Sequence, residues 1–351
     1  MKLYACDNCS APVYFMNEAC LSCGAALAFD SVSRTMVVFD ANADANAAAA
    51  GQPARRLCAN HETAAKCNWI ALPESEDNYC HSCSLTTVIP DQDEEQNRNA
   101  WRLAEAAKRR WLYSILQLGL PAVPKEENET QLGLSFEILQ PTTKLTKVLT
   151  GHNNGKITIN ATEADPIALL AKRTGLDEPY RTLLGHFRHE SGHYYWQRLI
   201  ETDPGLLESF RERFGDERLD YSEALKAHYN AGPVPGWQAN HVSAYAASHP
   251  WEDFAETWAH YMHIADAVEL AQSWQVAFSG YPQAESQKFV DPVQASPQFK
   301  ALLAQWLPLS LFANSLNRSL GHDDAYPFAP SPIVLDKLAW LHDQCITVKS
   351  S

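Results

Sequence analysis

Residues 185–197 read GHFRHESGHYYWQ and contain the motif His189-Glu190-Ser191-Gly192-His193. Two histidines four residues apart lie one turn apart on the same face of a helix, where both can bind one zinc ion. Glu190 lies about 100° around that helix, beside the open coordination position, and can accept a proton from water that the metal activates. Composition predicts only roughly 0.03 chance occurrences of this motif. The motif therefore predicts a catalytic zinc site that still lacks its third ligand.

The third ligand is expected on a second helix. The extended motif HExxHxxGxxH is excluded, because Trp196 and Leu199 stand where it requires glycine and histidine. The downstream segment SHPWEDFAETWAHYMH, residues 248–263, predicts a helix capped by Ser248, with proline in its first turn.

Glu252 and Glu256 share one face of this second helix. The Glu-x-x-x-acid spacing is the gluzincin pattern, in which the first carboxylate binds zinc and the second orients a ligating histidine. We therefore expect Glu252 to be the ligand and Glu256 to support a histidine, with the reverse assignment as the alternative. Ala255 and Ala259 on the same face, together with Gly185 and Gly192 on the first helix, predict close packing of helix backbones. His186, His260 and His263 are expected to be packing, supporting or surface residues.

A hydrolase of this kind also needs a donor for the oxyanion that develops during attack on a carbonyl. Tyr245, His249 and Tyr326 are candidates, although each residue type also suits a core or capping role.

Eight of the nine cysteines lie within the first 83 residues. Cys6, Cys9, Cys20 and Cys23 form the pattern CxxC-x10-CxxC, and four thiolates so arranged favour a tetrahedral zinc site. A second group has looser spacing and predicts a second structural zinc; its members are Cys58, Cys67, Cys80 and Cys83. His61 and His81 could replace a cysteine there, but the set of four is already complete. The cofactor prediction is thus one catalytic and two structural zinc ions.

The chain has 351 residues and a formal net charge of −14, which argues against a nucleic-acid or anionic-membrane partner because like charges repel. Residues 1–90 carry five Lys/Arg against nine Asp/Glu, so a protein partner is the better expectation for this segment. No apolar run approaches the ~20 residues that span a bilayer, and MKLYACDNCS lacks the apolar core of a signal peptide. A cytoplasmic location is therefore predicted.

The elements that must position these residues predict an α+β protein. We expect a zinc-ribbon module over residues 1–90 and a mostly helical domain with a small β-sheet over residues 91–351; the resemblance described next implies that this second domain is a zincin-like metallopeptidase domain. Residues 41–56 form an alanine-rich insertion between the cysteine groups. Helix signals cover 91–121, and strand-like runs cover Leu134–Leu139, Leu145–Thr150 and Lys156–Asn160, the last two joined by an Asn-Gly turn. From about residue 177, where Asp-Glu-Pro marks a helix start, the chain is expected to be mostly helical.

Nearly the whole chain resembles a bacterial family of zinc metallopeptidases with an N-terminal zinc ribbon, zincin-like and largely uncharacterised. Beyond the paired CxxC motifs, the resemblance rests on CANHETAAKCNW (58–69), TGHNNGKITIN (150–160), EPYRTLLGHFRHESGHYYW (178–196), AYAASHPWEDFAETWAHY (244–261) and NRSLGHDDAYPF (317–328). It implies a zincin fold and a peptidase activity. Glu256 stands where the gluzincin pattern usually has Asp.

Residues and resemblance together predict a zinc-dependent metallohydrolase, and within that class a peptidase acting on peptide or protein substrates. The hairpin at 145–160 could pair with an extended peptide by strand addition. Two alternatives remain: a non-catalytic scaffold that keeps zinc for stability, and a zinc hydrolase of a non-peptide amide. Glu190 disfavours the scaffold, since a structural site needs no base beside the metal.

Overall fold

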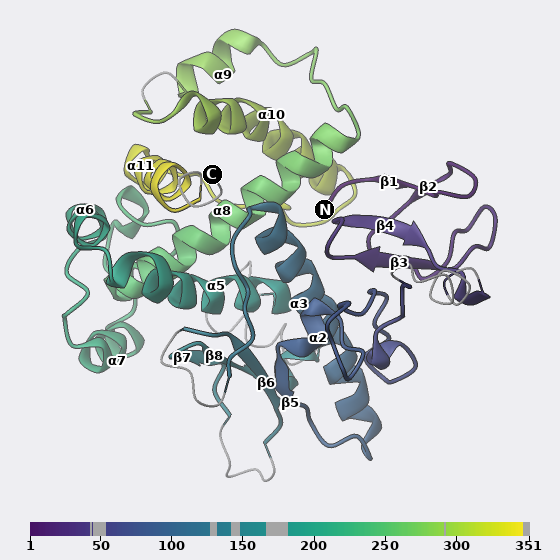
Figure 1. The fold of residues 1–351 in the computed structure, drawn as a ribbon. Helices are drawn as coiled ribbons and strands as arrows, with labels where there is room; N and C mark the ends of the chain where they lie inside the picture. Colours follow the sequence, from purple (N-terminus) through teal and green to yellow (C-terminus); the bar gives the residue numbers. More distant parts are fainter. Residues whose placement is uncertain are drawn as a thin grey trace. The chain divides into compact units, whose positions relative to one another are not determined.

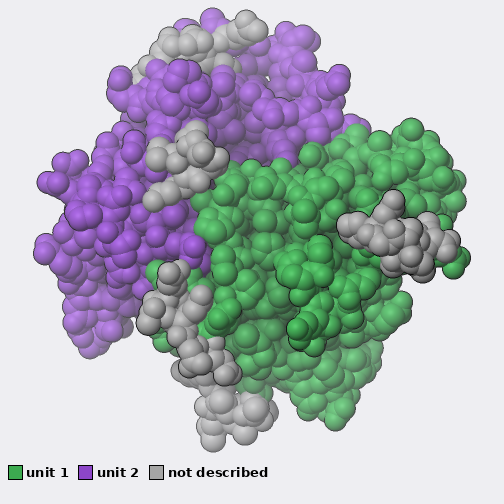
Figure 2. All heavy atoms as spheres, viewed as in Figure 1, with its two compact units in different colours: residues 1–187 green, residues 188–351 purple. Residues whose placement is uncertain are grey.

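The computed structural model describes residues 1–42, 44, 54–126, 132–141, 148–165, 182–290 and 293–346. The chain divides into two compact units, Met1–Phe187 and Arg188–Ser351, which Figure 2 colours separately. Small sheets and long helices confirm the α+β class (Figure 1). Most of the alanine-rich insertion, the start of the strand predicted at 145–150 and the helix start predicted at 177–179 lie outside the described residues.

The N-terminal part of the first unit consists of two short antiparallel hairpins (Figure 1). Strands β1 (Tyr4–Ala5) and β2 (Pro12–Val13) form the first, and β3 (Leu27–Asp30) and β4 (Thr35–Val38) form the second. An aromatic cluster lies behind them: the rings of Phe15 and Phe29 are 4.9 Å apart, and those of Phe29 and Trp69 are 4.8 Å apart. Such pairs stabilise a module whose own core is small.

The helix predicted at 91–121 is α3, Glu95–Gln117. Gly119 ends it with φ of 69°, a conformation that favours glycine. Tyr113 of α3 packs on Phe15 with ring centroids 5.0 Å apart, so α3 shares a core with the hairpins. Lys108 and Arg109, in the middle of α3, are fully buried. Lys108 Nζ donates to Glu105 Oε1 at 2.9 Å, which compensates the buried charge.

A four-stranded sheet completes the described part of the first unit. Its order is β5-β6-β8-β7, with β5 parallel to β6, β6 parallel to β8, and β7 antiparallel to β8. The strands are β5 (Thr86–Val88), β6 (Ser135–Leu139), β7 (Gly151–Asn153) and β8 (Lys156–Asn160). Asn154 and Gly155 both have positive φ between β7 and β8, which confirms the predicted Asn-Gly turn. Two short helical segments flank the sheet: α2 (His81–Ser84) and a 3₁₀ turn at Ala161–Ala164.

Among the described residues of the second unit, all regular structure is helical (Figure 1). Helix α5 (Leu183–Trp196) runs into it and continues as a wider π turn at Gln197–Glu201. The remaining α-helices are α6 (Pro204–Phe214), α7 (Tyr221–Ala231), α8 (Pro250–Ser273), α9 (Gln283–Val290), α10 (Pro297–Ser319) and α11 (Pro332–Trp340). No helix among the described residues has the length and apolar character needed to cross a bilayer.

Candidate metal centre

Helices α5 and α8 position the residues of the predicted catalytic site. Tyr195 of α5 stacks on Trp258 of α8, with ring centroids 4.7 Å apart and planes at 20°. A Cβ at Gly192 would lie 2.7 Å from the Cα of Ala255, closer than atoms can pack. The predicted close approach is thus confirmed at Gly192, where the absence of a side chain lets the two backbones meet.

The start of α8 differs from the prediction in its cap. His249, not Ser248, is the N-cap residue, and its Nδ1 accepts a hydrogen bond from the Trp251 N–H at 3.1 Å. Ser248 Oγ instead donates to the Tyr245 carbonyl at 2.7 Å. Propensity favours serine at a cap, but Ser248 belongs to the preceding 3₁₀ turn, Tyr245–Ser248, and α8 begins one residue later than that cap required.

The ligand atoms of His189, His193 and Glu252 converge at one point, all within 4.8 Å of one another. Glu252 Oε2 lies 2.9 Å from His189 Nε2 and 3.5 Å from His193 Nε2. A tetrahedral metal with bonds of ~2.0–2.1 Å separates its ligands by about 3.3 Å. Two imidazole nitrogens and one carboxylate oxygen also form a common donor set of catalytic zinc, so the residues fit this metal.

Glu256 holds the His189 ring in the orientation that directs Nε2 toward the point where the ligand atoms converge. His189 Nδ1 donates to Glu256 Oε1 at 2.6 Å, and Ser243 Oγ donates to Glu256 Oε2 at 2.7 Å. An ionised carboxylate only accepts hydrogen bonds, so Nδ1 carries a proton. The Nε2 atom, which faces Glu252, can then either carry a second proton or bind a cation that it shares with Glu252, as it would at a metal site.

The electrostatics of the centre favour a positive charge. Burial opposes an ionised Glu252, but the neighbouring His193 and His189 hold the pKa of its carboxyl well below the usual range. Burial likewise opposes a charged His189, yet hydrogen bonds and attraction from Glu252 and Glu256 raise its pKa well above the ordinary value. The two carboxylates thus supply the negative charge that would balance a divalent cation.

Glu190 is buried, with only 8% of its surface exposed. Burial raises the pKa of Tyr245 well above the ordinary value, and the charges of Glu252 and Glu190 contribute to the rise. The Tyr245 ring lies 5.8 Å from the His189 ring, centroid to centroid. Of the three predicted oxyanion donors, Tyr245 is therefore the one that lies beside the cluster.

The other two predicted donors have different partners. His249 Nε2 donates to the Leu219 carbonyl at 3.1 Å, so both of its ring nitrogens are engaged. The Tyr326 hydroxyl lies 2.6 Å from Nδ1 of His260, a buried histidine whose pKa burial lowers to about 4. His263 is also buried, against Arg188.

The sequence does not predict two of the contacts around the centre. The Tyr221 hydroxyl donates to Glu252 Oε1 at 2.6 Å, and Ser243 holds Glu256. Tyr221 is 31 residues from Glu252 in the chain, beyond the reach of any helical periodicity. Burial is the main cause of its raised pKa, and Glu252 adds to it.

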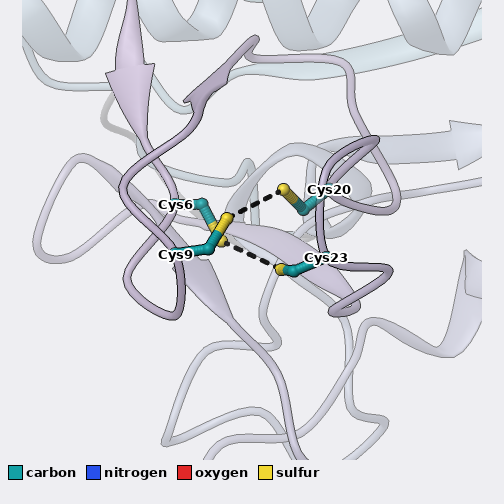
Figure 3. A group of neighbouring side chains, drawn as sticks. All are labelled: Cys6, Cys9, Cys20 and Cys23. Carbon is teal, nitrogen blue, oxygen red and sulfur yellow. Dashed lines mark hydrogen bonds between the residues drawn. The ribbon is translucent and has the colours of Figure 1, made fainter.

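The two cysteine groups are assembled as the spacing predicts. In Figure 3 the turn bearing Cys6 and Cys9 faces the turn bearing Cys20 and Cys23. The Sγ atoms of Cys6 and Cys23 are 3.8 Å apart and those of Cys9 and Cys20 are 3.7 Å apart, too far for a disulfide of about 2.05 Å. They match the edge of a tetrahedron with metal–sulfur bonds of ~2.3 Å, about 3.8 Å.

The second group brings together Cys58, Cys67, Cys80 and Cys83, all of them buried. The neighbouring histidines are committed elsewhere: His61 Nδ1 lies 2.9 Å from the Cys67 carbonyl and His81 Nε2 lies 2.7 Å from the Ala122 carbonyl. The Cys80 N–H donates to Cys58 Sγ and the Cys83 N–H to Cys80 Sγ, each at 3.4 Å. Such bonds favour the thiolate forms that metal binding requires.

A cysteine ribbon followed by a helical unit with a His–His–Glu cluster defines the class of zinc-binding metallopeptidases with a zinc ribbon. The chain belongs to the family described as "Putative zinc-binding metallo-peptidase", whose model matches residues 97–344, and a zinc-ribbon domain model matches residues 3–94.

Two uncharacterized proteins, one from Mycobacterium bovis and one from Mycobacterium tuberculosis, are each 41% identical to the chain over 342 residues. Each match covers 97% of this chain and 94% of the relative. No solved structure gives a significant match.

Proposed function

We propose that the chain is a zinc-dependent peptidase whose catalytic metal is held by His189, His193 and Glu252. The observation that carries the proposal is the convergence of their three ligand atoms while Glu256 engages the far nitrogen of His189. Membership of a zinc-binding metallopeptidase family supports it. Bound zinc would lower the pKa of a coordinated water to about 7 and polarise the substrate carbonyl.

The protein residues have separate tasks in this reaction. Glu190 accepts a proton from the attacking water and then delivers it to the leaving amine nitrogen as the peptide bond breaks. Glu190 is thereby returned to its ionised form. Glu256 keeps His189 in the tautomer that binds through Nε2. Tyr245, beside His189, is the proposed donor to the oxyanion.

The proposal extends to the rest of the chain. Residues 1–90 form a ribbon module with two structural zinc ions, and residues 91–351 form the peptidase domain. The acidic ribbon docks a protein rather than a nucleic acid, and the protein acts in the cytoplasm on peptide or protein substrates. These assignments rest on charge, cysteine spacing and the two family matches.

The decisive test incubates the zinc-loaded protein with a diverse peptide library and identifies products by mass spectrometry, with Glu190→Gln as the matched control. Glutamine is isosteric and cannot take the proton, so hydrolysis should fall at least ~100-fold while zinc content and folding stay unchanged. Equal activity of the two proteins would disprove the role of Glu190.

Two further outcomes favour the alternatives. Full zinc content with no cleavage of any peptide, but cleavage of small acyl amides, would identify a hydrolase of non-peptide amides. Full zinc content with no turnover of either class would identify a zinc-stabilised scaffold.

A further inference from the structure

We infer that Tyr221 is a positioning residue that holds Glu252 with a single oxygen directed at the metal. This inference rests on the proposed function, because it gives Tyr221 a task at the zinc site proposed there. The two oxygens of Glu252 have different surroundings. Oε1 accepts a hydrogen bond from the Tyr221 hydroxyl at 2.6 Å, whereas Oε2 lies 2.9 Å from His189 Nε2 and 3.5 Å from His193 Nε2.

The hydrogen bond is of a strong type. Glu252 is 1% exposed, and an ionised carboxylate in such surroundings needs a partner for each oxygen. A hydroxyl that donates to a carboxylate over 2.5–2.7 Å makes a bond roughly twice as strong as one between neutral groups. Tyr221 therefore compensates the oxygen that does not face the histidines.

Helix α7 does not place Tyr221 by burying an apolar face of its own, since none of its residues is buried. Three contacts made by His249 and Trp251, at the start of α8, locate the phenol instead. His249 Nε2 donates to the carbonyl of Leu219, two residues before Tyr221, at 3.1 Å. The Tyr221 ring lies 5.2 Å from the His249 ring and 5.9 Å from the Trp251 ring. The cap of α8 thus also fixes the residue that orients Glu252.

The consequence concerns coordination number. A glutamate with one oxygen held by a phenol binds a metal through the other oxygen alone. Together with two histidines this gives three protein ligands, which leaves the fourth tetrahedral position open for water, the arrangement of catalytic zinc. Without the phenol, Oε1 is free to bind as well, and it would compete with water for the position that the reaction needs.

The test measures the metal and not the reaction. The catalytic metal is removed from the full-length protein by brief chelation, and metal analysis checks that the cysteine sites keep their zinc. The centre is then reloaded with Co²⁺, whose visible absorption is intense when four-coordinate and weak when five-coordinate. The variant is Tyr221→Phe. The matched control is Tyr261→Phe, which removes the hydroxyl of a buried tyrosine of α8; this hydroxyl lies 2.8 Å from His342 Nδ1 and not against a ligand of the metal.

Wild type and Tyr261→Phe should give the intense four-coordinate spectrum. Tyr221→Phe should give the weaker five-coordinate spectrum and bind the metal about 10–100-fold more weakly in competition with a chelator. Thermal unfolding of both variants shows whether each loses a comparable amount of stability.

A Tyr221→Phe protein with the wild-type spectrum and affinity overturns the inference while leaving the zinc site intact. Absence of a cobalt spectrum in the wild type as well overturns the proposed zinc site itself, and the role of Tyr221 with it. The two failures are therefore distinguished by the wild-type measurement.

Discussion

At the scale of single residues, the two nitrogens of His189 are shared between two carboxylates of one helix. Nδ1 bonds Glu256 and Nε2 faces Glu252, so the two acids four residues apart on α8 cannot exchange roles without turning the ring. The sequence left the choice between them open, because both lie on one helical face. The geometry favours Glu252 as the ligand, since it alone of the two also faces His193.

We therefore predict different effects of the two alanine substitutions. Glu252→Ala should lose the catalytic metal during dialysis that the wild type survives, because a direct ligand is gone. Glu256→Ala should keep the metal but bind it about 10–100-fold more weakly, because only the support of His189 is lost. Metal analysis by mass spectrometry measures both, with the cysteine-bound zinc as internal reference. The reverse pattern would make Glu256 the ligand.

The residues that sequence reasoning could find are those that belong to a local spacing pattern, including Glu252 and Glu256 on one face of a helix. His189, Glu190 and His193 lie within one helical turn or so, and each CxxC pair lies in one turn. Tyr221 and Ser243 lie beside the centre only because of the tertiary fold, so no spacing in the sequence predicts their contacts. His249 misled in a different way, because its hydrogen bonds make it a cap and a brace rather than a donor to substrate.

At the scale of elements, the metal centre depends on how closely α5 and α8 approach. Their contact places Gly192, which directly precedes His193, against the backbone of Ala255, which lies three residues after Glu252. The glycine and alanine pattern predicted this contact correctly, since small side chains at helical spacing have few other uses in a buried face. The exact helix starts were not predictable, because a preceding 3₁₀ turn took over the cap of α8.

Gly192→Ala should separate the two helices. The new Cβ would meet Ala255 Cα at 2.7 Å, so the backbones must move, at a cost of ~1–3 kcal/mol for overpacking. Chemical denaturation should show this loss, together with weaker binding of the catalytic metal. Gly205→Ala in α6 is the control: its Cβ meets nothing closer than 3.5 Å, and stability should hold or rise by ~0.4–1 kcal/mol. Unchanged stability of Gly192→Ala would show that the helices can yield.

At the scale of the whole molecule, the fold class followed from the motifs, whereas the division into compact units depends on tertiary contacts. The density of cysteines marks residues 1–90 as a module in the sequence, and the zinc-ribbon match covers residues 3–94. The compact units instead divide between Phe187 and Arg188. The aromatic contact between Phe15 and Tyr113 explains part of this, because it joins the ribbon to α3 in one core. Such contacts depend on tertiary packing, which local composition does not encode.

Complete loading should give three zinc ions per chain, one for each of the three ligand groups. Metal analysis of the reconstituted protein measures the ratio. Alkylation of the eight ribbon cysteines before loading provides the control and should leave one. A reproducible ratio of one without alkylation would reject both cysteine sites.

The two cysteine groups differ in solvent exposure, and this difference should determine how fast each site exchanges its zinc ion. Cys9 and Cys23 are exposed, whereas all four cysteines of the second group are buried. A small chelator can attack a metal only where a ligand atom is reachable from solvent, so the first site should exchange its ion by direct attack and the second only after local unfolding. Incubation with isotopically enriched zinc, followed by native mass spectrometry, should therefore show one fast and one slow exchange phase within the ribbon. Equal rates at the two sites would mean that both open through the same motion. If the two rates differ as expected, the occupancy of the solvent-facing site would follow the concentration of free zinc. The buried site would keep the ion that it acquired when the chain folded.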